Sequence, residues 1–336
     1  MRVVQSQTYS IHIGGTALDK IDVSTYSKVA ILVDENTERY CLDIFLKKTN
    51  ISYHVLIRIH SGEKNKNIST CQHIWEELTK HTFDRKSLFI NLGGGVIGDM
   101  GGFAASCYKR GIDFIQVPTT LLAMVDASIG GKLGIDFSNL KNQIGLFKNP
   151  KGVYIFPSFL NTLDKTQLYS GYAEVVKHSL IYDAEMWGNL ISTSVEELNW
   201  EEIIERSIGI KNEIASADPK ENGLRKILNF GHNIGHAIEG YCLSIGKEVL
   251  HGQAIATGML LESKLSNLSD EERDEINSFL QSTFEIINLP HFEKLLPFLE
   301  NDKKNENNVF KFSLLSKIGK CNFDCTVDIP KIKALF

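Results

Sequence analysis

The sequence predicts an α/β domain built on a parallel, Rossmann-like sheet, followed by an all-α domain. In the first 150 residues, short apolar runs alternate with amphipathic stretches, as in a parallel sheet that helices cover on both faces. From about residue 158 onward, long segments follow the helical period instead. A length of 336 residues is enough for two hydrophobic cores. We therefore expect one domain at residues 1–157 and a second at residues 158–336.

Each predicted element rests on such a run. Four strand-like runs lie in the first domain, at residues 28–34, 51–57, 87–92 and 114–118. Amphipathic stretches at 38–48 and 71–81 predict helices between them. In the second domain the segment 199–216 follows the helical period. The charged, Asn-rich stretch 300–308 predicts an exposed loop before a final β-like segment at 310–315.

Composition excludes several classes of partner. Apolar residues make up 43% of the chain and charged residues 23%, the balance of a water-soluble globular protein. A net charge of −5 and a pI near 6.1 leave no broad basic surface for nucleic acid or for an anionic membrane. The sequence shows neither an apolar run of about 18 residues nor the apolar core of a secretory signal near its start. Because its six cysteines are also scattered, we expect a reduced, cytoplasmic protein without nucleic-acid or membrane partners.

A glycine-rich turn follows the third strand-like run. Gly93, Gly95 and Gly98 satisfy the pattern G-x-G-x-x-G directly after a strand and before a predicted helix. Glycines let the backbone approach a pyrophosphate closely, and the start of a helix directs N–H groups at it. The pattern alone is weak, because a tight turn without a ligand would look the same. It favours a dinucleotide site, with a mononucleotide as the alternative.

Polar residues follow two other strand-like runs. Asp34 and Asn36 come at the end of the first run and are candidates for contacts with a ribose. Thr119 and Thr120 come just after the fourth run. Ligands of open α/β sheets gather at the carboxyl ends of the strands. We therefore expect these residues and the glycine turn to lie along one crevice.

The segment 223–239 carries a regular series of polar residues. Spacings of 4, 3 and 4 predict that four of them share one face of a single helix: Arg225, Asn229, His232 and His236. Such a stripe spans roughly 16 Å, which suits an elongated anionic substrate better than a single atom. Gly231 and Gly235 predict close packing of another element. A metal-binding His pair and a solvated polar face both remain open.

Three further polar residues are ambiguous when each is taken alone. His251 begins a helical run that is compatible with a position beside the segment 223–239, but a single His of this kind is more often structural. Glu174 and Lys177, three residues apart, share a helix face, as a surface ion pair would. Only their combination with other motifs indicates a site.

The connecting segment 118–147 is too apolar for a disordered loop and too rich in glycine for one helix. Its polar members are Asp126, Lys132, Lys141 and Asn142. A lysine next to glycine suits the close approach of an ammonium group to phosphate. An irregular packed crossover with exposed lysines is the alternative.

Taken together, ten segments between residues 28 and 320 resemble the 3-dehydroquinate synthase family. In chain order they read VDEN, GEKNK, GGGVIGD, YKRG, PTTLLAMVDASIGGK, KNQIG, AEVVKH, GLRKILNFGHNIGHAIE, LHG and NDKK. Several long motifs in this order are far more specific than any one of them. The resemblance implies an NAD-binding N-terminal domain, a helical C-terminal domain and an active site in the cleft between them, which is the dehydroquinate synthase-like fold. It also implies NAD+ and Zn2+ (or Co2+) as cofactors.

The resemblance assigns roles to the residues that match the family's motifs. It implies a zinc site formed by Glu174, His232 and His251. It implies an NAD site lined by Asp34, Asn36, Glu63, Lys66, Gly94, Gly95, Val96, Asp99, Thr119, Thr120, Lys141 and Thr162. It implies contacts with the substrate phosphate from Lys132, Asn142, Asn229, His236 and either Lys303 or Lys304. It also implies that Lys211 and Arg225 hold the substrate carboxylate, and that Asp126 and Lys177 hold its hydroxyls. Arg110 resembles a residue that the family supplies across a dimer interface, which implies a homodimer.

The family's reaction converts 3-deoxy-D-arabino-heptulosonate 7-phosphate into 3-dehydroquinate and phosphate, in the shikimate pathway of aromatic amino-acid biosynthesis. It is a lyase reaction that proceeds by transient oxidation, phosphate elimination, reduction, ring opening and aldol cyclisation, so NAD is regenerated in each turnover. One departure concerns a motif that usually reads His-Gly-Glu, because here Gln253 stands in the third position.

Three alternatives to this activity stay open. A cyclase of a neutral sugar phosphate has no substrate carboxylate for Lys211 and Arg225 to bind. A metal-dependent polyol or alcohol dehydrogenase of the same fold needs no cluster of phosphate-binding residues. A catalytically silent regulatory protein needs no intact set of metal ligands. The sequence therefore favours the synthase.

Overall fold

The computed structural model describes residues 1–6, 8–138, 140–300 and 310–336. Contacts within the chain divide it into two compact units. The first comprises Met1–Leu168 and Trp200–Asn212, and the second comprises Tyr169–Asn199 and Glu213–Phe336. The expected division into domains at residue 157 stays a prediction, because these units exchange segments and follow no single cut.

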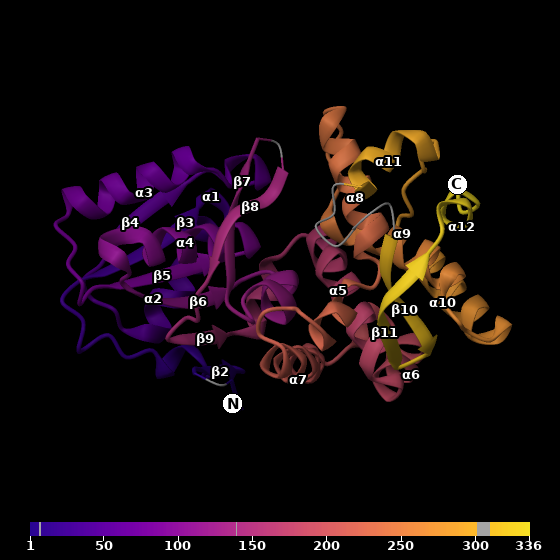
Figure 1. The fold of residues 1–336 in the computed structure, drawn as a ribbon. Coiled ribbons are helices and arrows are strands. Elements are labelled where there is room, and N and C mark those ends of the chain that lie inside the picture. Colours follow the sequence, from indigo (N-terminus) through magenta and orange to yellow (C-terminus); the bar gives the residue numbers. More distant parts are fainter. Residues whose placement is uncertain (7, 139, 301–309) are drawn as a thin grey trace. The chain divides into compact units, whose positions relative to one another are not determined.

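The first unit is built on a seven-stranded sheet (Figure 1). In chain order its strands are β1 (Arg2–Gln5), β2 (Ser10–Ile13), β3 (Val29–Asp34), β4 (Val55–Ile59), β5 (Leu88–Gly93), β6 (Asp113–Pro118) and β9 (Gly152–Ile155). Across the sheet the order is β1-β2-β9-β6-β5-β3-β4, and each neighbouring pair is parallel except β1 with β2. The predicted parallel sheet is confirmed, since the four expected runs correspond to β3, β4, β5 and β6.

Strand β4 begins later than the sequence analysis predicted. The expected run started at residue 51, whereas β4 starts at Val55, which pairs with Ala30 of β3. Residues 51–54 precede the first pairing with β3, and Tyr53 among them is 75% exposed. An apolar run can therefore continue beyond the part of it that has a partner strand.

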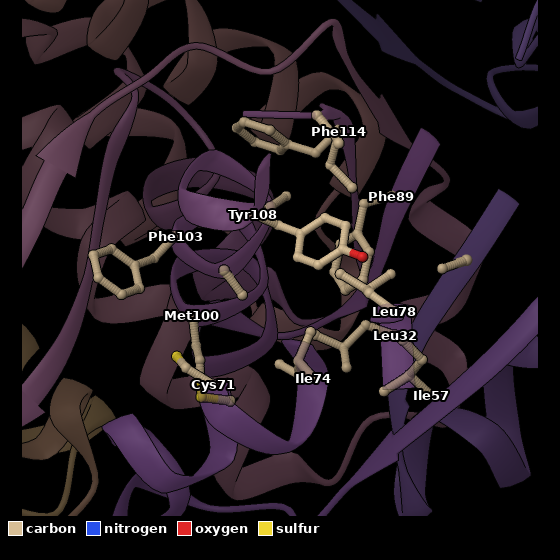
Figure 2. Packing of buried hydrophobic residues seen from close by; sticks show 14 of the residues in the cluster. Leu32, Ile57, Cys71, Ile74, Leu78, Phe89, Met100, Phe103, Tyr108 and Phe114 are labelled. Carbon is tan, nitrogen blue, oxygen red and sulfur yellow. The ribbon is translucent and has the colours of Figure 1, made fainter. Parts of the chain in front are cut away.

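Helices α3 (Ile68–Lys80) and α4 (Gly95–Cys107) pack against one face of this sheet. Asn67 begins α3, because its side chain accepts the N–H group of Thr70. Figure 2 shows the resulting core, whose side chains come from strands and helices alike: Leu32, Ile57, Cys71, Ile74, Leu78, Phe89, Met100, Phe103, Tyr108 and Phe114. The helix predicted at 71–81 is thereby confirmed as α3. This core fixes α4, and with it the glycine turn, against the sheet.

The helix predicted at 38–48 is not regular. The one-turn helix α1 (Glu35–Thr37) leads into a π-helical stretch, Glu38–Leu42, and then into α2 (Asp43–Thr49). Cys41, Leu42 and Phe45 turn inward from these pieces. The amphipathic pattern thus indicated the buried face correctly but not the change of helix type.

The sheet changes direction between β3 and β5. The chain passes from β3 to β4 on one side, and returns to place β5 on the other side of β3. At such a switch point the loops leave in opposite directions and open a crevice at the carboxyl ends of the strands. Asp34 ends β3 and Gly93 ends β5, so both lie at this crevice.

The connecting segment 118–147 forms a hairpin that the sequence analysis did not predict. After a π-helical turn at Ala123–Ala127, β7 (Lys132–Phe137) pairs antiparallel with β8 (Leu140–Phe147). Gly134 and Gly145 face each other in this pairing, and a Cβ on Gly145 would lie 2.3 Å from the carbonyl oxygen of Leu133. The glycines that argued against a helix therefore allow two strands to approach closely.

The remaining helices are α5 (Lys165–Tyr182), α6 (Ala184–Ser192), α7 (Trp200–Ala217), α8 (His232–Ser244), α9 (His251–Leu265), α10 (Asp270–Thr283), α11 (Phe292–Glu300) and α12 (Ile329–Lys333). The helix predicted at 199–216 is confirmed as α7. An antiparallel hairpin, β10 (Phe310–Lys317) with β11 (Lys320–Val327), adds two strands to the helical unit and contains the expected β-like segment. Most of the predicted loop at 300–308 lies outside the described residues. Across the part of the chain that is described, none of the helices is long and apolar enough to cross a membrane.

The single helix predicted for 223–239 is wrong. The segment forms a 3-10 helix at Leu224–Asn229, and α8 starts only at His232. Between them Gly231 adopts a left-handed conformation with φ +80°, which ends one helix direction and starts another. Arg225 and Asn229 therefore do not share one helix face with His232 and His236.

Candidate functional site

Three potential metal ligands meet inside the second unit. Glu174 lies on α5, His232 is the first residue of α8, and His251 is the first residue of α9. Glu174 Oε1 lies 3.4 Å from Nε2 of His232 and 3.4 Å from Nε2 of His251. One ligand atom from each residue lies within 4.8 Å of the others. A tetrahedral zinc ion, with ligand distances of about 2.0–2.2 Å, requires ligand atoms grouped in this way.

Hydrogen-bond acceptors behind both rings orient the imidazoles. Nδ1 of His232 lies 3.1 Å from the carbonyl oxygen of Phe230, and Nδ1 of His251 lies 3.4 Å from Glu239 Oε1. Because these oxygens only accept, we assign a proton to Nδ1 of each ring, so Nε2 is the ring atom that faces Glu174 and that a metal ion would bind. Metal-binding histidines commonly have a carbonyl or carboxylate behind them in this way.

The carboxylate of Glu174 fits the same chemistry. Its side chain is fully buried, and Oε1 makes no hydrogen bond among the described residues. A buried carboxylate oxygen without a donor is costly unless a cation meets it. The other oxygen, Oε2, contacts Nζ of Lys177. One carboxylate and two imidazoles on a buried surface are a donor set that suits zinc.

Glu174 and Lys177 are not the surface ion pair that their spacing suggested. Their side chains are 0% and 2% exposed. Burial raises the pKa of Glu174, but the charge of Lys177 and the neighbouring His232 outweigh it and hold that pKa well below its usual range. Lys177 thus keeps the carboxylate ionised.

The two histidines differ in their charge. Burial, together with the nearby Lys177, lowers the pKa of His232, so its ring stays neutral. Burial also lowers the pKa of His251, but the charges of Glu239 and Glu174 outweigh it and raise the pKa to about 10. A metal ion that binds here displaces the proton of His251, as is usual for imidazole ligands.

The other residues of the segment 223–239 divide between two elements. His236 follows on α8, one turn after His232, with ring centroids 5.0 Å apart, and it is exposed. Arg225 lies on the 3-10 helix and is 2% exposed, and its Nη1 donates to the carbonyl oxygen of Pro219 at 3.1 Å. Asn229 Nδ2 donates to Glu221 Oε1 at 2.8 Å.

In the first unit, a buried lysine gathers several of the predicted residues. Lys66 is 3% exposed, and its Nζ lies 2.7 Å from Asp99 Oδ2 and 2.7 Å from Asn142 Oδ1. Burial lowers the pKa of Lys66, but the carboxylates of Asp99 and Glu63 outweigh it and raise the pKa. Nζ of Lys141 lies 3.8 Å from Glu63. Four of the residues assigned to NAD therefore share one polar cluster with Asn142, which was assigned to phosphate.

The glycine turn joins β5 to α4 as predicted. Gly94 occupies the N-cap of α4 without a side-chain cap, so the first N–H groups of the helix have no side-chain cap as acceptor. A Cβ on Gly94 would lie 3.1 Å from Cγ2 of Thr120, a tight contact that favours glycine there. Gly98 packs closely against Gln116, because a Cβ there would lie 3.2 Å from Gln116 Oε1. The absence of a side-chain cap at the start of α4 fits the approach of a phosphate to Gly94 and Gly95.

Other residues of the expected cofactor site already have local partners. Asp34 Oδ1 accepts the N–H groups of Asn36 at 3.0 Å and of Thr37 at 2.8 Å, which caps α1. Thr119 N–H donates to the carbonyl oxygen of Gly93 at 3.0 Å, which ties the end of β6 to the glycine turn. The hydroxyl of Thr162 donates to the carbonyl oxygen of Phe159 at 2.8 Å. Val96 is half-buried in the first turn of α4.

Lys211 and Asp126 bind each other. Nζ of Lys211 lies 2.5 Å from Oδ1 of Asp126 and 2.6 Å from its carbonyl oxygen, and Lys211 is 6% exposed. Lys132 is exposed at the start of β7. Arg110 is exposed and has φ +68°, directly after Lys109 with φ +50°. Lys303 and Lys304 lie outside the described residues.

The sequence analysis missed two carboxylates that contact predicted site residues. Asp136 Oδ1 accepts the N–H group of Asn142 at 2.8 Å, and Glu239 stands behind His251. Glu239 is the last residue of the segment 223–239, three positions after His236, so its spacing alone could have suggested it. For Asp136 the hairpin is needed, because only the pairing of β7 with β8 brings it to Asn142.

Comparison with known proteins identifies the family. The models of the 3-dehydroquinate synthase N-terminal and C-terminal domains match residues 56–170 and 171–305. The chain belongs to the 3-dehydroquinate synthase family. The 3-dehydroquinate synthase of Nitratiruptor sp. is 40% identical over 95% of this chain and 92% of its own length. That of Parabacteroides distasonis is 36% identical, over 91% and 90% respectively.

Solved structures of two synthases and of a dehydrogenase share the fold of this 3-dehydroquinate synthase family member. One is 2-deoxy-scyllo-inosose synthase complexed with carbaglucose-6-phosphate, NAD+ and Co2+, with a TM-score of 0.86, 23% identity and 99% of each chain covered. Another is the 2-epi-5-epi-valiolone synthase of Streptomyces hygroscopicus with NAD+ and Zn2+, with a TM-score of 0.87, 24% identity, and 100% of this chain and 97% of that chain covered. An iron-containing alcohol dehydrogenase follows with a TM-score of 0.70, 14% identity, and 100% of this chain and 98% of that chain covered.

Gln253, the departure from the usual motif of the 3-dehydroquinate synthase family, has partners of its own. Its Nε2 donates to Glu285 Oε2 at 2.8 Å, and its Oε1 accepts the N–H group of Leu250 at 3.2 Å. The second bond caps the first turn of α9, directly at His251. Glutamine can make both bonds, whereas glutamate in this place would face the carboxylate of Glu285.

Proposed function

We propose that this chain is a 3-dehydroquinate synthase, which converts 3-deoxy-D-arabino-heptulosonate 7-phosphate into 3-dehydroquinate and phosphate with NAD+ and Zn2+ (or Co2+). The observation that carries the proposal is the buried carboxylate oxygen of Glu174, which lies 3.4 Å from Nε2 of His232 and 3.4 Å from Nε2 of His251. The curated relatives described above carry this enzyme's name.

Glu174, His232 and His251 would hold the metal, and the crevice at β3, β5 and β6 would hold the cofactor. When bound, the metal acidifies a substrate hydroxyl, and NAD+ takes up and returns the hydride. Lys177 keeps Glu174 anionic, while Phe230 and Glu239 keep the two rings oriented. This chain's own residues thus supply a fixed set of donors before the substrate arrives.

The predicted NAD-binding residues would act in two ways. The uncapped N–H groups at Gly94 and Gly95 would bind the pyrophosphate, with Val96 and Asp99 in the same turn and a half of α4. The remaining members of the set would contact the rest of the dinucleotide: Asp34, Asn36, Glu63, Lys66, Thr119, Thr120, Lys141 and Thr162. A charged Lys66 beside Asp99 and Asn142 supports this role.

The substrate would be held by its two anionic ends. Lys211 and Arg225 would bind the carboxylate, a bidentate acceptor that suits guanidinium geometry. The phosphate would be bound by Lys132, Asn142, Asn229, His236 and either Lys303 or Lys304. Asp126 and Lys177 would hold hydroxyl groups. These groups would supply hydrogen bonds and charge to the substrate, so the chain would accelerate the reaction mainly by orientation and charge.

We further propose a homodimer in which Arg110 reaches the neighbouring site, and a cytoplasmic location. The exposed side chain of Arg110 on a left-handed backbone supports a specialised position for this residue. Two of the alternative activities predict results that differ from those of the synthase. A cyclase of neutral sugar phosphates would not use Arg225, and a polyol dehydrogenase would accumulate NADH.

The test is release of phosphate from the heptulosonate phosphate by the purified protein with NAD+ and zinc. We expect phosphate and 3-dehydroquinate in equal amounts, without net formation of NADH. Glu174→Ala should abolish the reaction and the binding of zinc, and Arg225→Ala should abolish the reaction but keep zinc. Glu293→Ala is the control, because this exposed carboxylate forms an ion pair with Lys333 and has no proposed role in binding. Turnover of a neutral sugar phosphate in place of the acid would overturn the proposal.

A further inference from the structure

A buried carboxylate binds the backbone on both sides of His232. Glu262 lies on α9, the helix that begins with His251, and its side chain is 0% exposed. Its Oε2 accepts the N–H group of Gly231 at 2.6 Å, and its Oε1 accepts that of Ile234 at 3.1 Å. Gly231 and Ile234 flank His232 in the sequence. One carboxylate therefore holds the backbone on both sides of a proposed metal ligand.

The first turn of α8 cannot provide this cap from its own side chains. Its N-cap residue is Gly231, and a Cβ there would lie 2.5 Å from Cγ of Met259 and 3.1 Å from the carbonyl oxygen of Ile255. The approach is equally tight from the other side, since a Cβ on Gly258 would lie 2.0 Å from the carbonyl oxygen of Gly231. The N–H groups at the start of a helix need acceptors. Glu262 supplies them from the neighbouring helix.

The position of this cap determines where the ring of His232 stands. His232 is the first residue of α8, so its Cα direction depends on the φ of Gly231, which is +80°. The carbonyl oxygen of Phe230, which accepts from Nδ1 at 3.1 Å, belongs to the same turn. A negative charge at the start of a helix is also favoured by the helix dipole. Backbone, ring and acceptor are therefore fixed together.

We propose that Glu262 is a positioning residue of the metal site, a role that rests on the proposed zinc ligands. It acts through the backbone of Gly231 and Ile234, and places Nε2 of His232 opposite Glu174. Helix α9 thus contributes to the metal site in two ways. It provides the ligand His251, and it provides Glu262, which positions His232 relative to His251.

A second capping carboxylate, partly exposed where Glu262 is fully buried, tests whether loss of such a cap elsewhere in the unit also affects the metal site. Glu272 on α10 also accepts two backbone N–H groups, from Ser269 at 3.1 Å and from Ile318 at 3.0 Å. It belongs to the same compact unit but caps a helix that carries no proposed ligand. Glutamine at either position keeps one oxygen acceptor and turns an NH2 group toward the other N–H group. The two substitutions therefore remove the same kind of interaction.

The experiment compares Glu262→Gln with Glu272→Gln in the full-length protein after removal of metal. The zinc dissociation constant is measured by competition with a chelator, and the visible spectrum of bound Co2+ reports the ligand geometry. We expect Glu262→Gln to raise the zinc dissociation constant by roughly 10–100-fold, the usual effect of losing a group behind a ligand, and to alter the Co2+ spectrum. Glu272→Gln should leave both unchanged, and neither variant should change the NAD+ dissociation constant.

Wild-type zinc affinity in Glu262→Gln would refute the proposal, and so would an equal loss in both variants, since that would be a stability effect. If Glu262→Gln does not fold, Glu262→Asp replaces it, because the shorter carboxylate keeps the charge but not both bonds, and the same loss is expected. Zinc binding that survives Glu174→Ala would overturn the zinc ligands themselves, and with them this role.

Discussion

Replacing Gly258 by alanine tests the backbone contact between α8 and α9. The new Cβ would lie 2.0 Å from the carbonyl oxygen of Gly231 and 2.9 Å from the amide nitrogen of Gly235. Since Cβ contacts below 3.0 Å essentially do not occur, the helices must separate locally by 3.0 − 2.0 = 1.0 Å or more. The blocking atoms are backbone, so no side-chain rotation relieves the overlap. We expect the free energy of unfolding to fall by about 1–3 kcal/mol, the usual cost of overpacking.

The same displacement should reach the metal site. His232 begins α8 and His251 begins α9, and both Nε2 atoms now lie 3.4 Å from Glu174 Oε1. A relative shift of about 1 Å is large for a coordination geometry that tolerates about 0.2 Å. We therefore expect zinc to bind at least roughly tenfold more weakly.

Gly188→Ala is the matched control for this substitution. Gly188 lies within α6 of the same unit, and a Cβ there would meet nothing within 4 Å. Alanine at this position should raise the free energy of unfolding by about 0.5–1 kcal/mol, because glycine is the poorer helix former. Urea unfolding and zinc titration measure both quantities. Wild-type stability together with wild-type zinc affinity in Gly258→Ala would show that the contact is softer than the structure implies.

Three other outcomes follow from the described contacts. Lys66→Met should lower the free energy of unfolding by about 3 kcal/mol in urea titrations, since Asp99 loses a buried cation, and adding Asp99→Asn should recover most of it. Zinc at 100 times its dissociation constant should stabilise the metal-free protein by about 2.7 kcal/mol, measured by thermal unfolding, and Glu174→Ala should remove this effect. Mixing Arg110→Ala with Glu174→Ala subunits should restore activity at about a quarter of the sites, if Arg110 acts across a twofold dimer. No recovery after subunit exchange would contradict that assignment.

The parts of the fold that follow a strong local pattern could be predicted from the sequence. Strands β3 and β5 are buried on both faces, so their apolar runs are continuous and easy to recognise. The break at Gly231 could not be predicted, because it depends on α9 approaching so closely that only glycine fits, with Glu262 supplying the cap. The periodicity of 223–239 was real but spanned two elements.

In the candidate site, too, local motifs could be predicted from the sequence, whereas contacts that depend on tertiary packing could not. His232 and His251 could be identified as possible ligands from motifs alone, but their convergence on Glu174 depends on the packing of α5, α8 and α9. The pairing of Lys211 with Asp126 was not predicted, since the two residues are distant in sequence and each was assigned to the substrate. The assigned roles in NAD and phosphate binding stay predictions, because the described contacts are those among the protein's own side chains.

The three proposed metal ligands all belong to the second compact unit, whereas the residues proposed for NAD belong to the first. Substitutions at the proposed metal ligands should therefore change zinc affinity and leave NAD+ affinity as it is, and substitutions in the first unit should do the reverse.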